Sequence, residues 1–324
     1  MGKKNLILFS GRSSTALTGR IAELVECPLG RCRVERFPDG EIDVRLEESV
    51  RGREVFLVQS TCPPVNDSLF ELLCLADACR RSSALSVVAV VPYFGYARSD
   101  KRRGQRIPIA ASMVEELIET VGIGHLITVD LHTAQIGGFF HIPVDGLTAV
   151  PTLCGALATQ LPADVVVVSP DEGRFKAATE YGRLLGAPVA ILHKRREDGA
   201  SARVIKVVGE VEGRPCLLID DMITTGGTLA GALEALLQAG ARAEIYIAAT
   251  HGLFVDGARA KLSHSAVRAI YVTDSITTTI SDWPGLSVVS LAPLLASTIR
   301  RLCTGQSLTD LFERAIVGSE VQLD

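Results

Sequence analysis

The sequence lacks the features that mark several classes of protein. It contains no CxxC pair, and its eight cysteines do not have the spacing of metal ligands. No apolar run is long enough to span a membrane. The formal net charge of −4, with 22% charged residues, gives no basic field for nucleic acid. We therefore expect neither nucleic acid nor a membrane as a partner.

The composition that remains is typical of a globular cytoplasmic protein. Hydrophobic residues make up 47% of the chain, which is enough for packed interiors. A short apolar run at 6–9 breaks at once into a polar Gly/Ser turn, unlike a signal peptide. Several cysteines lie inside apolar stretches, which suits reduced, buried thiols: Cys74, Cys79, Cys154 and Cys216.

Strand-like and helical patterns alternate along the chain, which predicts parallel sheets covered by helices. With 324 residues the chain exceeds the usual size of one core. We predict an α/β fold with two tandem domains, 1–149 and 150–324, each a mainly parallel sheet flanked by helices, and with closing C-terminal helices at 293–302 and 307–315. The predicted strands are 6–9, 55–59, 86–92, 126–130, 165–169, 188–193, 216–220, 243–250 and 269–273. The predicted helices between them are 68–82, 109–121, 175–185, 229–240 and 257–262.

The most informative segment is 216–229, CLLIDDMITTGGTL. It predicts a buried strand, then Asp220 and Asp221 where the strand ends, then a Thr/Gly loop that opens into a helix. Small residues, Thr hydroxyls and a helix N-terminus together favour a phosphate site. The acidic pair would repel a bare phosphate, so it must face sugar hydroxyls or a bound Mg²⁺. The alternative is an ordinary strand-to-helix turn with solvated carboxylates.

Polar residues also follow other predicted strands, at the edge where parallel sheets bind ligands. The segment 93–103 interleaves aromatic and basic residues, which could sandwich a purine and hold a polyphosphate. His132 and Asp171 each follow a strand and could share a divalent ion, although His is not a typical Mg²⁺ ligand. Solvated loop charges and a structural histidine remain alternatives.

Lys194, Arg195 and Arg196 begin a polar stretch without strong periodicity. It suggests a mobile arm whose cations close over a transition state, as phosphoryl transfer requires. A hairpin with solvated charges is the alternative.

Taken together, these segments resemble ribose-phosphate pyrophosphokinases, the phosphoribosyl pyrophosphate (PRPP) synthetase family. The likeness runs over nearly the whole chain. The segments that carry it are FPDGEIDVRLEESVRG (37–52), VFLVQSTCPPVNDSLFELL (55–73), VPYFGYARSDKR (91–102), DLHTAQIGGFF (130–140), SPDEG (169–173), KRR (194–196) and IDDMITTGGTL (219–229).

The resemblance implies two type I phosphoribosyltransferase-like domains, with ATP on the N-terminal side and ribose 5-phosphate on the C-terminal side. It implies catalytic Lys194 and Arg196 and a Mg²⁺ cofactor held by His132 and Asp171. The ATP site would comprise Phe37, Asp39 and Glu41 of an adjacent subunit with Arg98, Ser99 and Asp100. The ribose 5-phosphate site would comprise Asp220, Asp221, Thr224, Thr225, Gly226, Gly227 and Thr228.

The implied assembly is a homo-oligomer, a hexamer built from dimers, with phosphate and ADP as candidate effectors. The implied reaction transfers the diphosphoryl group of Mg-ATP to the C1 hydroxyl of ribose 5-phosphate and gives PRPP and AMP. Two other functions compete: a non-catalytic regulatory homologue, and a phosphoribosyltransferase that consumes PRPP. Lys194, Arg196 and His132 argue against the first, and the ATP-like segment argues against the second.

The sequence departs from the family pattern in three places, two single positions and one three-residue segment. The family usually has Gln where this chain has Ser99, and Asp where it has Thr224. Glu172, Gly173 and Arg174 stand in place of Val-Gly-Gly. These changes leave the kinetics and the nucleotide preference open.

Overall fold

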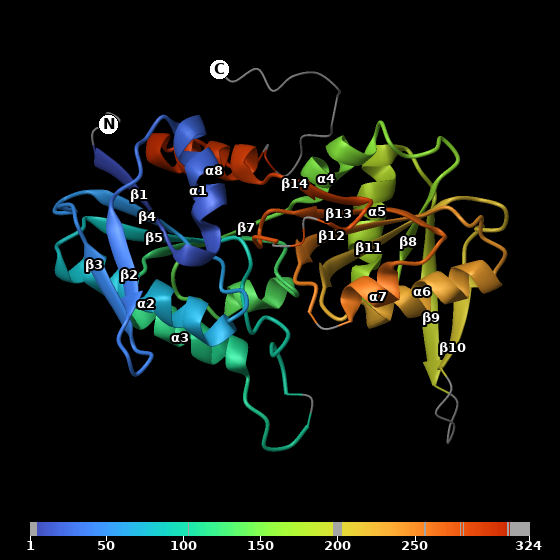
Figure 1. Ribbon diagram of the computed structural model, residues 1–324, viewed down its shortest axis with the longest axis horizontal. Coiled ribbons are helices and arrows are strands. Elements are labelled where there is room, and N and C mark those ends of the chain that lie inside the picture. The colour runs from blue at the N-terminus through green and yellow to red at the C-terminus, as the bar shows by residue number, and fades with distance from the viewer. Residues whose placement is uncertain are drawn as a thin grey trace. The chain divides into compact units, whose positions relative to one another are not determined.

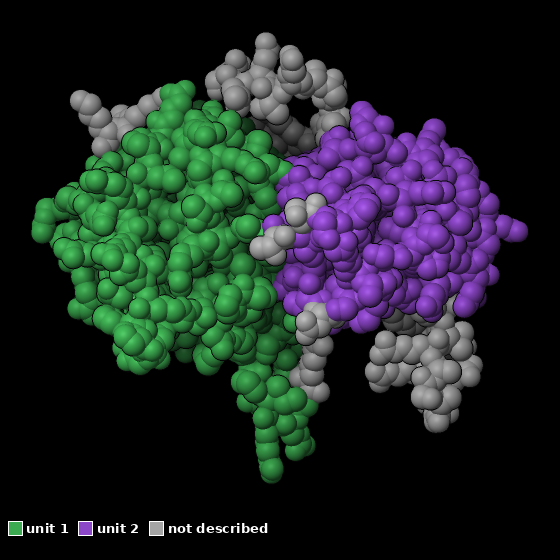
Figure 2. Space-filling model, in the orientation of Figure 1, with its two compact units in different colours: residues 1–148, 274–277, 290–312 green, residues 149–273, 278–289, 313–324 purple. Residues whose placement is uncertain are grey.

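The computed structural model describes residues 5–102, 104–196, 203–255, 257–278, 280, 282–309 and 311. Two compact units are formed, unit 1 within residues 1–148, 274–277 and 290–312, and unit 2 within 149–273, 278–289 and 313–324 (Figure 2). The predicted domains placed the C-terminal helix in the second domain, whereas α8 (Ala292–Thr304) belongs to unit 1. It packs on α1 (Thr15–Val25), where the Arg300 guanidinium donates a hydrogen bond to the Leu24 carbonyl at 2.7 Å.

Unit 1 contains a five-stranded sheet in the order β1-β4-β5-β6-β7, with all neighbours parallel. Helices α1 and α8 lie on one side of this sheet, and α2 and α3 lie on the other (Figure 1). The elements besides α1 and α8 are β1 (Leu6–Ser10), β2 (Cys32–Arg36), β3 (Ile42–Leu46), β4 (Glu54–Val58), α2 (Val65–Arg81), β5 (Ser86–Val91), α3 (Ala110–Thr120), β6 (His125–Val129) and β7 (Val144–Leu147).

Unit 2 contains a seven-stranded sheet in the order β10-β9-β8-β11-β12-β13-β14, parallel except at the β9/β10 edge. Its elements are α4 (Val150–Leu157), β8 (Val166–Ser169), α5 (Phe175–Leu185), β9 (Val189–Arg196), β10 (Arg203–Val208), β11 (Cys216–Ile223), α6 (Gly227–Gln238), β12 (Ile245–Gly252), α7 (Ala258–Leu262), β13 (Val267–Thr273) and β14 (Leu286–Val289).

The central strands of both sheets are continuous apolar runs, as expected for sheets covered on both faces. Val87–Val91 of β5 and Val166–Ser169 of β8 are buried throughout. The predicted α/β class with two mainly parallel sheets is confirmed. The sequence did not predict β7 and β14, which are four residues long and only partly buried, so their apolar pattern is weak.

The two sheets differ in strand order. In unit 1 the order follows the chain from one edge to the other, whereas in unit 2 it reverses at β8, whose neighbours are β9 and β11. Ligands of open α/β sheets bind beyond the carboxyl ends of the strands at such a reversal. The end of β8 and the adjoining part of β11 are therefore the favoured site in unit 2.

Among the described residues, no helix has both the length and the apolar character needed to cross a membrane. All eight cysteines are free thiols. Cys79, Cys154 and Cys216 are buried as predicted, and Cys74 is half-buried. Burial raises the pKa of Cys154 and Cys216 to about 12, so these thiols stay protonated and inert at neutral pH.

Candidate active site

The acidic pair of unit 2 lies inside a strand rather than at its end. β11 runs to Ile223, three residues beyond the predicted end at Asp220. Its pairing with β8 stops at Leu218, but its pairing with β12 continues to Ile223. The pair therefore lies where β11 extends past β8. The alternative of a turn with solvated carboxylates does not fit, because the side chains of Asp220 and Asp221 are only 13% and 6% exposed.

An arginine compensates the charge of this pair. Arg174 ends the short turn Glu172–Arg174 that follows β8. Its Nη2 lies 3.2 Å from Asp221 Oδ2, and its Nε lies 3.9 Å from Asp220 Oδ1. Burial, and then the neighbouring Asp221, raise the pKa of Asp220 well above its ordinary range, and Arg174 opposes that rise. The sequence marked Arg174 as a departure but did not predict this contact.

The Thr/Gly loop connects β11 to α6. Gly226 has φ 71°, a conformation that favours glycine, and a Cβ there would lie 3.1 Å from Leu262 Cγ. The loop is anchored where the Val255 N–H donates to the Thr224 carbonyl at 3.1 Å. Thr225, Gly227 and Thr228 are exposed. The first N–H groups of a helix have no partner within it, so the start of α6 can bind an anion.

In unit 1 the segments after β5 and β6 come together. The Thr133 hydroxyl donates to Asp100 Oδ2 at 3.0 Å, which places Asp100 beside the residue that follows His132. Asp100 is 7% exposed, and its Oδ1 has no hydrogen-bond partner among the described residues. His132 is half-buried and Arg98 is exposed. A buried carboxylate oxygen of this kind is suited to a cation or a hydroxyl that arrives with a ligand.

Ser99 has a structural role that its replacement of Gln did not predict. Its Oγ accepts a hydrogen bond from the Ala110 N–H at 3.2 Å, and its carbonyl accepts one from the Ala111 N–H at 3.2 Å. Both donors belong to the first turn of α3, whose N–H groups have no helical partner. Ser99 thus fixes the start of α3.

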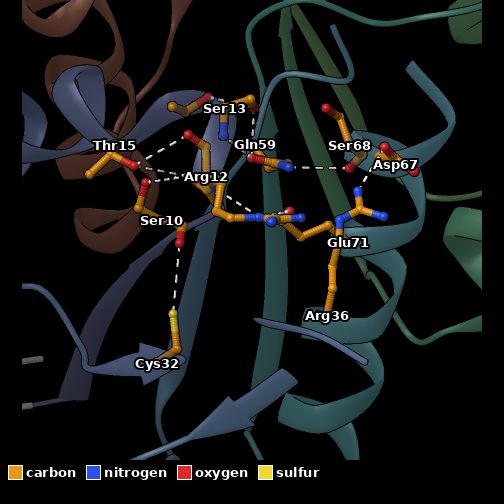
Figure 3. A network of polar contacts seen from close by, with 12 residues as sticks. Ser10, Arg12, Ser13, Thr15, Cys32, Arg36, Gln59, Asp67, Ser68 and Glu71 are labelled. Carbon is orange, nitrogen blue, oxygen red and sulfur yellow. Dashed lines mark hydrogen bonds and ion pairs between the residues drawn. The ribbon is translucent and has the colours of Figure 1, made fainter. Parts of the chain in front are cut away.

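Phe37, Asp39 and Glu41 form the exposed tip of the β2/β3 hairpin. The Phe37 N–H donates to the Glu41 carbonyl at 2.9 Å, and Asp39 Oδ1 accepts from the Glu41 N–H at 3.1 Å. Next to the tip, at the end of β2, Arg36 pairs with Asp67 of α2 at 2.7 Å (Figure 3). The hairpin therefore has a defined tip, with Phe37 50% exposed.

Sequence reasoning missed a polar network after β1 (Figure 3). The Arg12 N–H and Nε donate to the two oxygens of buried Glu71, at 2.6 and 2.8 Å. Ser13 Oγ donates to Gln59 Oε1 at 2.7 Å, and a Cβ at Gly11 would lie 2.1 Å from that atom. The signal was the run SGRSST at 10–15, a polar turn between a strand and a helix.

Lys194 and Arg196 lie in β9, which extends three residues beyond the predicted strand. In the register, Arg196 is opposite Arg203 of β10. The side chains of Lys194 and Arg196, and residues 197–202 of the predicted arm, lie outside the part of the chain that the structure describes.

The predicted metal ligands His132 and Asp171 belong to different units. Asp171 follows β8, and a Cβ at Gly173 would lie 3.3 Å from its Oδ1, so glycine leaves room beside this carboxylate. Among the described residues, one further group could hold a metal: Glu115, Glu119 and His141. Glu119 Oε1 already accepts the N–H groups of His141 and Ile142, at 2.6 and 3.2 Å, which is a structural task.

Comparisons with known proteins agree with these observations. Residues 6–122 match the N-terminal domain of ribose phosphate pyrophosphokinase, and residues 199–313 match the phosphoribosyl synthetase-associated domain. The ribose-phosphate pyrophosphokinase of Brucella melitensis is 44% identical over 310 residues, covering 94% of this chain and 99% of that protein. That of Burkholderia pseudomallei is 42% identical, covering 95% and 97%.

A solved structure gives the same result. The phosphoribosylpyrophosphate synthetase from Mycobacterium smegmatis superimposes with a TM-score of 0.87 and 42% identity, over 93% of this chain and 99% of that one. Both the sequence and the fold therefore match over nearly their full length. The chain belongs to the ribose-phosphate pyrophosphokinase family.

Proposed function

We propose that this chain is a ribose-phosphate diphosphokinase. The C1 hydroxyl oxygen of ribose 5-phosphate attacks the β-phosphorus of ATP, the bond from that phosphorus to the α,β-bridging oxygen breaks, and AMP leaves. The products are PRPP and AMP, and the hydroxyl proton is lost. The observation that carries the proposal is the strand reversal of unit 2, where the acidic pair adjoins the end of β8 and an exposed Thr/Gly loop begins α6.

The residues of unit 2 are suited to a sugar phosphate. Carboxylates accept hydrogen bonds from sugar hydroxyls, so Asp220 and Asp221 would bind the ribose ring. The N–H groups and hydroxyls of Thr225–Thr228 would bind the 5-phosphate at the positive end of α6. Thr224 can offer a hydroxyl to the sugar but adds no charge. In this proposal β11 binds the ribose ring, and the loop at the start of α6 binds the 5-phosphate.

In unit 1, Arg98, Ser99 and Asp100 would contribute to the ATP site. Arg98 is exposed in the segment that follows β5 and can reach a nucleotide. Ser99 would act mainly by fixing the backbone, since its hydroxyl already serves α3. Asp100 is held in place by Thr133, which leaves its second oxygen for the ligand.

The residues present also fit Mg²⁺, which prefers oxygen ligands. Asp171 has room beside its carboxylate, and the unpartnered Asp100 oxygen lies near the segment of His132. We propose that Asp171 and His132 each serve as a ligand of Mg²⁺. When bound, Mg²⁺ neutralises the charge on the polyphosphate.

Lys194 and Arg196 would stabilise the charge that develops on the transferred group. If so, Lys194→Ala and Arg196→Ala should each lower kcat by about a hundredfold with little change in substrate affinity, because one preorganised charge contact contributes roughly 2.7–4 kcal/mol. The measurement is AMP release that depends on ribose 5-phosphate. Lys206→Ala, at an exposed position of β10, is the matched control and should keep the wild-type rate. Wild-type rates in both arm variants would contradict the assignment, and no AMP release by the wild type would favour the regulatory homologue.

We also propose that the ATP site is shared between copies of the chain in a homo-oligomer, with phosphate and ADP as candidate effectors. The hairpin tip supports this, because the side chains of Phe37, Asp39 and Glu41 are exposed there. Mixing an inactive Asp39→Ala protein with an inactive Lys194→Ala protein should restore part of the activity. Some sites would then take an intact hairpin tip from one chain and an intact Lys194 from the other. No recovery in verified mixed oligomers would mean that each site belongs to one chain.

A further inference from the structure

Arg174, Asp220 and Asp221 form a compact group of charges at the strand reversal of unit 2. The Arg174 side chain is 17% exposed, and those of Asp220 and Asp221 are 13% and 6% exposed. Two neighbouring carboxylates with so little water around them repel each other strongly. A cation must therefore accompany them whenever both are ionised, and here the chain itself supplies one.

The guanidinium is supplied from a well-anchored turn. Ser169 Oγ donates to the Asp171 carbonyl at 2.7 Å, and the Arg174 N–H donates to the same carbonyl at 3.4 Å. On the outer side of the turn, Glu172 Oε1 lies 2.8 Å from His193 Nδ1 of β9. The turn is thus attached to both β8 and β9, which holds the Arg174 backbone beside β11.

Asp220 has room for a ligand beside Arg174. Its Oδ1 accepts a hydrogen bond from the Asp221 N–H at 2.9 Å and lies 3.9 Å from Arg174 Nε, and an ionised carboxylate has about four lone-pair positions. Sugar hydroxyls can therefore bind Asp220 while the guanidinium stays in place. A divalent cation at the pair would instead have to compete with Arg174 for the same oxygens.

We propose that Arg174 is the resident counter-ion of the ribose site and takes the place of a divalent cation there. The inference rests on the proposed function. It makes ribose 5-phosphate binding largely independent of Mg²⁺, while the ATP side keeps its need for the ion. Arg174 acts by positioning the acidic pair and lowering the repulsion within it.

The test is calorimetric titration of ribose 5-phosphate without ATP, in EDTA and in excess Mg²⁺. The wild type should bind with dissociation constants within about threefold of each other, since its counter-ion is always present. Arg174→Ala should bind about tenfold or more weakly in EDTA and regain most of the loss in Mg²⁺, because the ion then fills the vacated position. Arg174→Lys should lie between them, since an ammonium is a point charge without the guanidinium fork.

Arg183→Ala is the matched control, because Arg183 pairs with Glu180 on the surface of the adjoining α5 and should not alter either titration. The same Mg²⁺ dependence in wild type, Arg174→Lys and folded Arg174→Ala would overturn the proposal. Tighter binding by Arg174→Ala in EDTA would also overturn it, since Arg174 would then be blocking the sugar. If Arg174→Ala does not fold, Arg174→Lys decides alone. No binding by the wild type in either solution would contradict the proposed function itself.

Discussion

Each unit pairs an arginine with a buried carboxylate near the carboxyl ends of its parallel strands, but the two pairs differ in how completely they are closed. In unit 1, Arg12 donates both its backbone N–H and its Nε to Glu71 at 2.6 and 2.8 Å (Figure 3). In unit 2, Arg174 approaches Asp221 and Asp220 only to 3.2 and 3.9 Å. The first ion pair is at hydrogen-bonding distance on both carboxylate oxygens, whereas the 3.9 Å contact of Arg174 with Asp220 is too long for a hydrogen bond.

We infer from this difference that the Arg12–Glu71 pair is structural, whereas the group in unit 2 is the proposed ribose site. Glu71 also lies within a network of short bonds, with Ser13 bound to Gln59 beside it, so a ligand would have to break existing contacts. The contacts of Arg174 with the acidic pair of unit 2 are longer, and Thr225, Gly227 and Thr228 of the following loop are exposed. Similar residue types thus stabilise a turn in one unit and lie at the proposed ribose site in the other.

The largest expected effect comes from removing the carboxylates of Asp220 and Asp221. Asp220→Asn combined with Asp221→Asn should weaken ribose 5-phosphate binding by about a hundredfold or more, because two charged hydrogen-bond acceptors are lost at about 1.5–3 kcal/mol each. Calorimetric titration measures it, and circular dichroism checks the fold. Asp164→Asn, an exposed residue of the same unit, should bind normally. Unchanged affinity in the double variant would move the ribose site elsewhere.

A smaller effect, on stability alone, is expected for the Arg12–Glu71 pair. Glu71→Gln should lower the free energy of unfolding by about 1–3 kcal/mol, since it replaces a buried charged acceptor, and the half-exposed Arg12 keeps water as an alternative partner. Urea denaturation measures the change. Asp77→Asn is the control on the same helix, where the pairs with Arg80 and Arg81 are exposed, and should cost about 0.5 kcal/mol or less. A loss of ribose 5-phosphate affinity in folded Glu71→Gln would break the distinction between the two sites.

The smallest effect depends on pH. Because the pKa of Asp220 is raised above its ordinary 3.8 in the folded protein, the folded state binds this proton more tightly than the unfolded chain does. Stability from this proton is complete below the unfolded pKa and is lost as the pH rises through the folded one. Asp220→Asn cannot ionise, so it should gain about 1 kcal/mol over the wild type near pH 8, and the gain should shrink toward about pH 4. A gain that stays constant with pH would show that ionisation is not its cause.

The sequence predicted the elements that depend on local pattern. The long apolar runs of β5 and β11 and the helical periodicity of α5 identified these elements, and α5 has the predicted bounds, Phe175–Leu185. The Thr/Gly loop at the start of α6 was also predicted, since its glycines and threonines favour a phosphate-binding turn wherever they follow a buried strand. The hydrogen bond from Val255 that anchors the loop was not predicted, because Val255 belongs to the segment after β12, which is distant in sequence.

What the sequence could not predict depends on residues that meet only in the fold. The Arg174 contact requires β8 and β11 to be neighbours, and 46 or more residues separate the partners along the chain. The extension of β11 beyond Asp220 depends on β12, which offers a longer edge than β8. The assignment of α8 to unit 1 depends on its packing against α1. All three features depend on which elements are neighbours in the fold, and local sequence propensity does not determine that.

The most direct test of the central claim is ³¹P nuclear magnetic resonance of the wild-type protein with ATP, Mg²⁺ and ribose 5-phosphate. Our account predicts that AMP and a sugar bearing a diphosphate on C1 form in equal amounts, and only when ribose 5-phosphate is present. The Asp220→Asn, Asp221→Asn protein should form neither. Formation of ADP with a singly phosphorylated C1, or no sugar-dependent AMP at all, would contradict the proposed diphosphoryl transfer.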